Sequence, residues 1–270
     1  MEQLEGRVVV VTGGASGIGL GIAQAFAAAG ARLVLADVHD ARLAAAERAL
    51  CGATDVVTQR VDVRDAAQVE ALAERAYAAF GAVHVLCNNA GVACNGLVWQ
   101  HSLADWDWVF DTNVRGTVNG LRAFVPRMLA QGEPGHVVNT ASMLGLASSP
   151  LTGVYGASKQ TVLAITETLR LDLEIVGAPI GVSALCPGPV RTNVGEEPGR
   201  PPVDAAHTRG IVATVNAALR DVVANGMDPR EVGERVVDAV RAGRFWILPD
   251  PSLLANVDAR MAGLRSDVGG

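Results

Sequence analysis

Short runs of apolar residues alternate along the chain with longer segments in which apolar positions recur every three or four residues. The short runs are rich in valine and other β-branched residues and predict buried strands, whereas the longer segments predict amphipathic helices. The expected strands are residues 7–12, 32–37, 55–63, 83–89, 136–142, 180–188 and 245–248. The expected helices are residues 17–29, 41–50, a segment stopped by Gly81, 102–131, 154–176, a segment after Asp228-Pro229, and a tail after Asp250.

The expected strands are nearly continuous in apolar residues, which is typical of a parallel sheet covered by helices on both faces. We therefore expect an α/β fold with a single doubly wound parallel sheet of about seven strands, forming one domain over residues 1–270. Residues 191–228 interrupt the pattern, because they are rich in proline, glycine and charge before helical spacing resumes. This excursion lies at the carboxyl end of the sheet, where such folds bind ligands.

Two local signals refine the helix expected over 102–131. Ser102 followed by Asp105 has the spacing of a capping box and marks the start of the helix. Pro126 lies inside the same segment, where a proline removes a backbone donor and predicts a kink.

Composition limits the classes of function. The chain carries a formal net charge of -6, which argues against a nucleic-acid partner because phosphates would be repelled on average. No apolar run approaches the roughly 18 residues needed to span a bilayer. Residues 1–7 contain acidic side chains and no apolar core of a signal peptide. These features predict a cytoplasmic protein that acts on a small molecule, with no nucleic-acid or membrane partner.

The cysteines and the loop histidines suggest no metal site. The four cysteines show neither a Cys-x-x-Cys pair nor a Cys/His cluster with zinc spacing, so no metal is expected and these residues are interpreted as buried hydrophobes or incidental thiols. They are Cys51, Cys87, Cys94 and Cys186. His101 and His207 lie in expected loops and are interpreted as solvated.

A glycine-rich turn, "TGGASGIG", joins the first expected strand to the first expected helix. Glycines there allow a tight turn and a close approach of the backbone to a pyrophosphate, and the helix N-terminus supplies free N–H groups. The turn contains Gly13, Ser16, Gly17, Ile18 and Gly19. Asp37 ends the second strand, where an acid can bind the adenosine ribose diol; the alternative is an ordinary capping aspartate.

The spacing Gly-x-x-x-Gly-x-Gly resembles that of the short-chain dehydrogenases/reductases, and the resemblance extends over most of the chain. It implies a Rossmann-type fold and a nicotinamide dinucleotide, with adenine beside Asp62 and Val63 and the nicotinamide carboxamide beside Thr192. Further matches are "NNAG" at 88–91, with Asn89, Ala90 and Gly91, and "PGPVRT" at 187–192, with Pro187, Gly188, Val190 and Thr192. A weaker resemblance is to bacterial aryl-alcohol Cα-dehydrogenases.

The candidate catalytic pair is Tyr155 and Lys159, which stand four residues apart and so share one helix face. Lys159 is the only lysine in a chain with 22 lysines and arginines, which suggests that arginine cannot replace it. A nearby ammonium and a cationic nicotinamide would lower the phenol pKa from about 10 and allow Tyr155 to accept a proton. Ser142 can hydrogen-bond the substrate oxygen. The resemblance adds Asn113, which would hold a helix bend and a proton-relaying water.

These residues predict an enzyme that transfers a hydride between NAD and a secondary alcohol or ketone, without a catalytic metal. An NADPH-dependent carbonyl reductase is the main alternative, but it usually carries a basic residue where this chain has Ala15, Ser16, Asp37 and Val38. A non-catalytic NAD-binding protein would be expected to lack some of the four catalytic residues, and all are present.

The substrate is expected to be bulky and apolar, with an aryl group. The pocket is expected to be formed by residues 142–151, the stretch after Cys94, the excursion after Arg191 and the tail. The expected apolar lining is Met143, Leu144, Leu146, Leu151, Val154, Val194, Ile211 and Val212, and only Arg191, Arg200 and Arg209 are expected to offer basic groups. The helices over 105–131 and 154–176 are apolar around more of their circumference than one sheet face can cover, which predicts a homodimer or homotetramer. The chain departs from the family pattern in "RAGRFWILPDP" and the tail that follows.

Overall fold

A seven-stranded parallel sheet organises the chain, of which the computed structural model describes residues 1–192 and 210–269. The strands are β1 (Val8–Thr12), β2 (Arg32–Asp37), β3 (Val56–Arg60), β4 (Val85–Asn88), β5 (Gly135–Thr140), β6 (Ile180–Leu185) and β7 (Trp246–Ile247). They lie in the order β3-β2-β1-β4-β5-β6-β7, and each neighbouring pair is parallel. The chain therefore winds outward from β1, returns, and winds the other way from β4, which confirms the doubly wound sheet.

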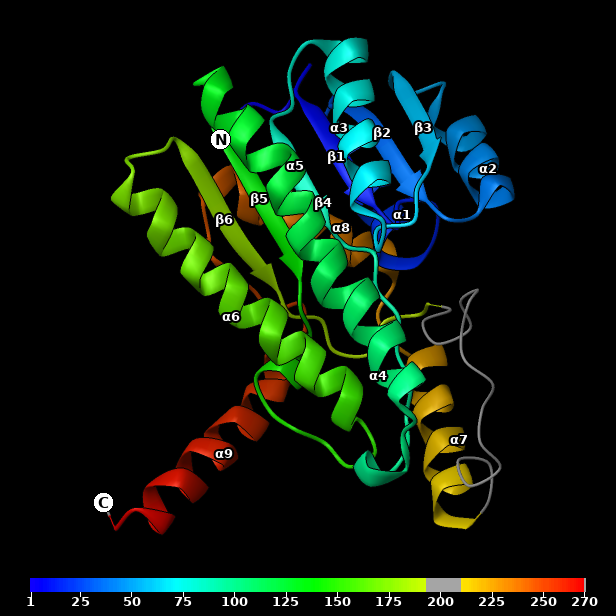
Figure 1. Ribbon diagram of the computed structural model, residues 1–270, viewed down its shortest axis with the longest axis vertical. Coiled ribbons are helices and arrows are strands. Elements are labelled where there is room, and N and C mark those ends of the chain that lie inside the picture. The colour runs from blue at the N-terminus through cyan, green and yellow to red at the C-terminus, as the bar shows by residue number, and fades with distance from the viewer. Residues whose placement is uncertain (193–209, 270) are drawn as a thin grey trace.

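Helices cover both faces of this sheet (Figure 1). They are α1 (Gly17–Ala28), α2 (Asp40–Leu50), α3 (Ala66–Phe80), α4 (Leu103–Phe110), α5 (Gly116–Gln131), α6 (Gly153–Ile175), α7 (Gly210–Ala224), α8 (Pro229–Ala242) and α9 (Leu254–Asp267). Helices α3, α5 and α6 lie in front of the sheet in Figure 1, and α1 and α8 lie behind it.

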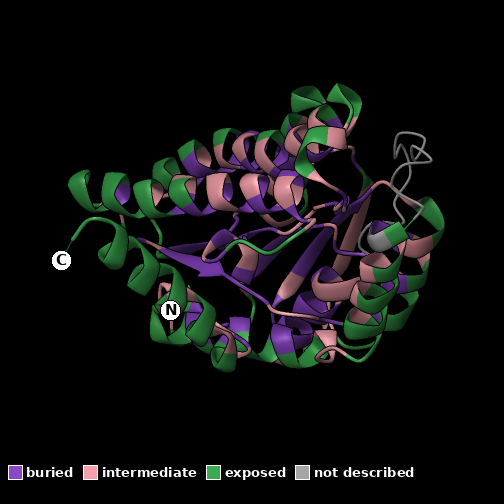
Figure 2. Ribbon diagram, turned by 90° about the horizontal axis from the view of Figure 1, so that it is seen from below, coloured by how far each residue is buried: buried purple, intermediate pink, exposed green. Residues whose placement is uncertain are grey.

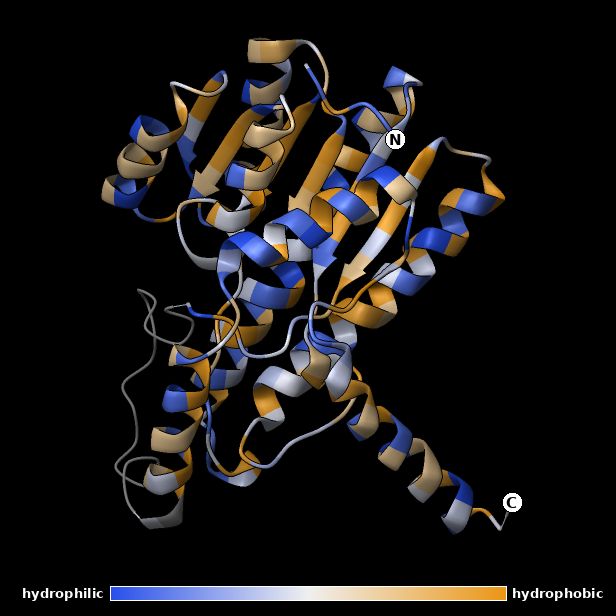
Figure 3. Cartoon of the chain, turned by 180° about the vertical axis from the view of Figure 1, so that it is seen from behind, coloured by the Kyte–Doolittle hydropathy of each residue, from blue (hydrophilic) through white to orange (hydrophobic). Residues whose placement is uncertain are grey.

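Strand β1 shows why the strand sequences are apolar throughout. Its side chains alternate between the two faces, and both faces are buried. Val9 and Val11 pack with α1 and α8, whereas Val8 and Val10 pack with α3 and α5. Figure 2 shows the strands as the buried centre of the molecule, and Figure 3 shows them as its most hydrophobic part.

Helices α7 and α9 lie beyond the carboxyl ends of the strands, away from the two covering layers (Figure 1). Helix α9 has no buried residue. Leu253, directly before α9, and Val257 in its first turn pack against a small core cluster that includes Ala184 of β6. None of the described helices is long and apolar enough to cross a membrane.

The segment expected as one helix over 102–131 is divided into α4, a π-helical turn at Asp111–Arg115, and α5. The capping box is confirmed, since Ser102 and Asp105 exchange the two expected hydrogen bonds. Helix α5 continues through Pro126, and the departure from α-helical geometry lies upstream of it, at the π turn. Strand β3 is also shorter than expected, because the chain leaves the sheet after Arg60.

Candidate active site

A cavity of about 1420 Å³ opens at the carboxyl ends of the strands. It is lined by the glycine-rich turn, by the segments that follow β2 to β6, and by parts of α7 and α9. Its lining includes residues that follow β1 and β4, where the strand order reverses, and this is the position at which doubly wound sheets bind ligands.

Gly13 and Gly17 form the turn under this cavity with left-handed backbones, at φ +62° and +50°. A Cβ atom at Gly13 would lie 2.9 Å from Ala90 Cα, and one at Gly17 would lie 2.9 Å from Thr192 Cγ2. Gly19 differs, because it packs the turn onto α1: a Cβ there would lie 2.0 Å from Gly13 O. Ser16 and Ile18 line the cavity at the start of α1, where free N–H groups favour an anion.

Asp37 links the turn to the end of β2. Its carboxylate accepts hydrogen bonds from Ala15 N at 3.2 Å and from His39 N at 3.1 Å. The residue is only 7% exposed, yet it lines the cavity. A partly desolvated carboxylate is thus held in place at the expected ribose end of the site.

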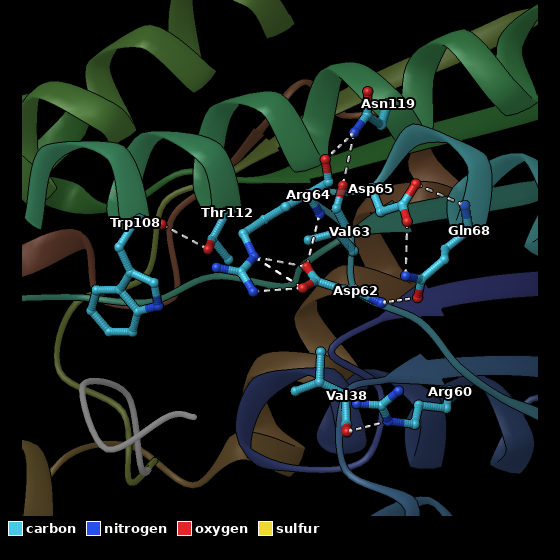
Figure 4. A network of polar contacts seen from close by, with 10 residues as sticks. All are labelled: Val38, Arg60, Asp62, Val63, Arg64, Asp65, Gln68, Trp108, Thr112 and Asn119. Atoms are coloured by element: carbon cyan, nitrogen blue, oxygen red, sulfur yellow. Dashed lines mark hydrogen bonds and ion pairs between the residues drawn. The ribbon is translucent and has the colours of Figure 1, made fainter. Parts of the chain in front are cut away.

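The segment after β3 forms the adjoining wall, and Figure 4 shows how it is fixed. Arg64 donates from Nε to Asp62 Oδ1 at 2.9 Å and from Nη2 to Asp62 Oδ2 at 2.6 Å. This hydrogen bonding lowers the pKa of Asp62. Asn119 Nδ2 donates to Val63 O at 2.8 Å. Asp62 and Val63 both line the cavity, so the expected adenine side of the site is held by these hydrogen bonds.

The "NNAG" segment is attached to the end of β1 by Thr12. The Thr12 hydroxyl accepts hydrogen bonds from Asn89 N at 3.0 Å and Ala90 N at 3.1 Å, and Asn89 Nδ2 donates to Thr12 O at 3.0 Å. Gly91 follows, and a Cβ atom there would lie 3.3 Å from Lys159 Nζ. The segment therefore connects the glycine-rich turn to Lys159, one of the expected catalytic residues.

Tyr155 and Lys159 emerge together from the first turns of α6 and line the cavity. Lys159 is 3% exposed, and its Nζ donates to Thr140 O at 2.8 Å and lies 5.7 Å from the centroid of the Tyr155 ring. Burial lowers the pKa of Lys159 to about 8. Burial also raises the pKa of Tyr155, opposed by a hydrogen bond with Ser142. Lowering the phenol pKa thus requires positive charge strong enough to outweigh burial.

Asn113 lies in the π turn and supports the site from behind. Its Oδ1 accepts from Val92 N at 2.8 Å, and its Nδ2 donates to Val92 O and to Ser158 Oγ, both at 2.9 Å. Asn113 is buried and is not part of the cavity lining. It joins the segment after β4 to the residue that precedes Lys159, and so determines how these two walls meet.

The "PGPVRT" segment closes the side of the cavity next to β6. Pro187, Gly188, Val190 and Thr192 all line it. Pro187 O accepts a hydrogen bond from Met143 N at 3.0 Å, which connects this segment to the residue after Ser142. All four expected catalytic residues and the expected cofactor residues are thus gathered at or directly behind one cavity.

The substrate end of the cavity differs from the expected lining. Met143 and Leu144 line it, but Leu146, Leu151, Val154 and Val212 do not. Val194 and the side chain of Ile211 lie outside the described part of the structure. Further lining comes from the loop after β4, from α7 within the expected excursion, and from the tail with α9, which are segments that the sequence indicated, and from α4, which it did not. It includes Cys94, Trp108, Leu219, Val223, Leu253 and Ala259.

The basic residues at this end also differ from the expected ones. Arg191 lines the cavity but is paired with Asp228. Arg200, Arg209 and His207 lie outside the described residues. Arg220 of α7 and Arg260 of α9 line the cavity instead, and no sequence signal marked them.

The interpretation of His101 as solvated was wrong. Its side chain is 1% exposed, and its Nδ1 lies 3.8 Å from both Cys94 Sγ and Asp105 Oδ2. The three side chains form a cluster beside the cavity, separated in sequence by six and by three residues. That spacing matches no common metal motif, and for this reason the sequence did not reveal the cluster.

Known proteins resemble this chain over nearly its whole length. The 1-deoxy-11-beta-hydroxypentalenate dehydrogenase of Streptomyces avermitilis is 37% identical, covering 98% of this chain and 91% of that protein. The C alpha-dehydrogenase of Sphingobium sp. is 32% identical, over 99% of this chain and 88% of that protein. This match confirms the resemblance to Cα-dehydrogenases. The crystal structure of a short-chain dehydrogenase/reductase from Burkholderia phymatum in complex with NAD is 40% identical, with a TM-score of 0.94, covering 99% and 97%.

The family model described as short chain dehydrogenase matches residues 7–200, which contain the glycine-rich turn and all four expected catalytic residues. On this match, and with these relatives, the chain belongs to the short-chain dehydrogenase/reductase family.

Proposed function

We propose that this protein is an NAD-dependent enzyme that interconverts a bulky, apolar or aryl secondary alcohol and its ketone. The observation that supports this most is the convergence of Ser142, Tyr155 and Lys159 on the cavity that also contains the glycine-rich turn. The turn fits a dinucleotide, since Gly13 and Gly17 leave a cradle that side chains would fill. When bound there, the nicotinamide supplies the acceptor or donor of the hydride.

Tyr155 is the group that exchanges the substrate proton in this proposal. Its raised pKa keeps the phenol protonated near neutrality, which is the form needed to donate a proton to a ketone oxygen. In the oxidation direction Tyr155 must accept the alcohol proton, which requires Lys159 to be charged and close. Ser142 hydrogen-bonds the same substrate oxygen, where negative charge develops, and orients it toward the phenol.

Three features at the ribose end favour NAD over NADP. The carboxylate of Asp37 is oriented by two backbone N–H groups, and a 2′-phosphate beside it would be repelled. The turn carries Ala15 and Ser16 rather than a basic residue. Arg60 is the β3 residue next to Asp37 in the strand register. Its Nε donates to Val38 O and lies 3.6 Å from Asp40, so this guanidinium is engaged by Val38 and Asp40 and not directed at a 2′-phosphate. The similar protein from Burkholderia phymatum was crystallised with NAD.

The apolar lining supports a bulky substrate. The substrate end is lined by Leu144, Trp108, Leu219 and Leu253. A ligand that buries apolar surface there gains roughly 25 cal/mol of binding free energy for each Å² of apolar area removed from water. One relative is named for the dehydrogenation of 1-deoxy-11-beta-hydroxypentalenate, and another is named as a C alpha-dehydrogenase.

A second candidate is a bulky alcohol that carries a carboxylate, favoured by Arg220 and Arg260 at the substrate end. Arg260 Nη1 donates to Leu146 O at 2.7 Å, which leaves other guanidinium donors to bind an anion. This candidate predicts a higher kcat/KM for a carboxylic acid than for its methyl ester. It also predicts that Arg220→Gln or Arg260→Gln removes this preference.

We also propose a homo-oligomer. Leu171, Ile175 and Val176 at the end of α6 are 50%, 83% and 66% exposed, and Leu129 of α5 is 40% exposed. Apolar side chains on these two neighbouring helices are suited to a contact between copies of the chain.

Tyr155→Phe removes only the proton carrier, so turnover should fall by about 10²- to 10⁴-fold while NAD binding changes little. Lys159→Arg should be similarly impaired, because the buried space beside Thr140 O fits an ammonium and not a planar guanidinium. Turnover and cofactor affinity are measured by absorbance and by fluorescence of the reduced cofactor. Tyr77→Phe, at the only other tyrosine, is the matched control. Near-normal activity of Lys159→Arg would contradict the role given to the single lysine.

The ratio of kcat/KM for NAD to that for NADP should clearly exceed one. Asp37→Asn keeps a hydrogen-bond acceptor but removes the charge, so it should lower the ratio toward one. Asp40→Asn, at the start of α2, should leave the ratio unchanged. A wild-type ratio near one, or one that favours NADP, would reject the proposed preference.

A phenyl-substituted secondary alcohol should be oxidised with a higher kcat/KM than a short hydroxy acid or a polyol, because only the first can bury apolar area against the lining. Initial rates at fixed NAD give the comparison. If either small polar compound were clearly preferred, the assignment of an apolar pocket would be incorrect.

Light scattering of the purified protein at micromolar concentration should give a mass that is a multiple of the 27.9 kDa chain. Ile175→Glu should shift this mass toward the monomer, since it places a charge in the proposed contact. A monomeric wild type would contradict the proposal.

A further inference from the structure

Three side chains of metal-ligating type meet on the wall between the cavity and α4. Cys94 comes from the loop after β4, His101 from the end of that loop, and Asp105 from the first turn of α4. Cys94 is 4% exposed, and the side chains of His101 and Asp105 are 1% and 13% exposed. Their ligand atoms all lie within 4.8 Å of one another.

The separations fit shared coordination better than direct hydrogen bonding. His101 Nδ1 lies 3.8 Å from Asp105 Oδ2, beyond the usual N–H···O range, and 3.8 Å from Cys94 Sγ, the outer limit of a weak thiol contact. Tetrahedral zinc holds sulfur, nitrogen and oxygen ligands about 3.4 to 3.6 Å from one another, as its bond lengths of roughly 2.0 to 2.3 Å require. The two 3.8 Å distances to His101 Nδ1 exceed that range by a few tenths of an ångström, and the remaining Cys94–Asp105 separation is at most 4.8 Å, so a bound cation would draw the three side chains closer together.

We propose that Cys94, His101 and Asp105 bind a divalent cation of the zinc type. A thiolate, an imidazole and a carboxylate together match the ligands that zinc prefers, and three protein ligands leave a fourth position for water. Asp105 Oδ2 also accepts from Ser102 N at 2.9 Å and from Ser102 Oγ at 2.8 Å, which orients the carboxylate as outer partners of a metal ligand do.

The site would act on the shape of the cavity rather than on the hydride transfer. The loop from Val92 to Ser102 forms this wall, and it is held by Asn113 at Val92 and by Leu151 O, which accepts from Gly96 N at 2.8 Å. A cation would fasten Cys94, between these two anchors, to the first turn of α4. It would thereby fix the cavity wall at Cys94 and Trp108, which pack in the same cluster.

The test uses the full-length protein, stripped with a chelator and free of cofactor and substrate. Co²⁺ added to it should give a cobalt–thiolate charge-transfer band that saturates at one equivalent, and Zn²⁺ should displace the cobalt. Competition with a chromophoric chelator gives the zinc affinity. Zinc should also raise the midpoint of thermal unfolding, because it binds only the folded chain tightly.

Cys94→Ser should abolish the thiolate band and weaken zinc binding by more than about 100-fold, because losing even an outer partner costs roughly 10- to 100-fold. His101→Gln should weaken zinc binding similarly while the thiol remains. Cys51→Ser, at the exposed cysteine, is the matched control and should change neither quantity. Circular dichroism checks that each variant is folded. Absence of the band in the wild type, or equal affinities for the wild type and folded Cys94→Ser, would overturn the proposal.

Discussion

The buried ammonium of Lys159 is the constraint around which the active site is arranged. A desolvated cation is costly unless polar groups compensate it, and Thr140 O at the end of β5 supplies the one direct hydrogen bond among the described residues. Space for the ammonium depends on Gly91, because a side chain there would press on Nζ. The position of α6 relative to that segment depends in turn on Asn113, which binds Val92 on one side and Ser158 on the other. The end of β5, the segment after β4 and helix α6 therefore all have to be positioned around the ammonium of Lys159.

Burial acts on Tyr155 and Lys159 in a way that opposes charge on both. It raises the pKa of the phenol and lowers that of the ammonium to about 8, so burial disfavours the charged form of each group although the lysine stays mainly protonated near neutrality. Proton exchange with a substrate requires the opposite, a phenol that can release its proton. The site thus has chemistry that responds to an added positive charge, such as an oxidised nicotinamide would bring.

Most of the fold, and the set of residues that lies together at the cavity, could be predicted from the sequence, because each depends on local signals. Apolar runs mark the strands, and the four-residue spacing of Tyr155 and Lys159 places them on one helix face. The π turn at Asp111–Arg115 carries no such signal, since it follows from the tertiary contacts of Asn113. The burial of His101 and the cavity positions of Arg220 and Arg260 depend on how distant loops and helices pack. Periodicity describes one element at a time and cannot report these contacts.

The contact between α1 and α8 has a consequence for how such a protein can diversify. A Cβ atom at Gly21 would lie 2.1 Å from Pro229 O, and one at Gly233 would lie 2.1 Å from Gly21 O, so the two helix backbones touch with no side chain between them. Neither Gly21 nor Gly233 can therefore carry a larger side chain unless the two helices move apart. Helix α9, by contrast, has no buried residue, and it contributes Arg260 to the cavity. Apart from Val257, which packs against the core, side chains on that helix can therefore be exchanged with little effect on the sheet, so the lining of the cavity can change while the glycine-rich turn stays the same.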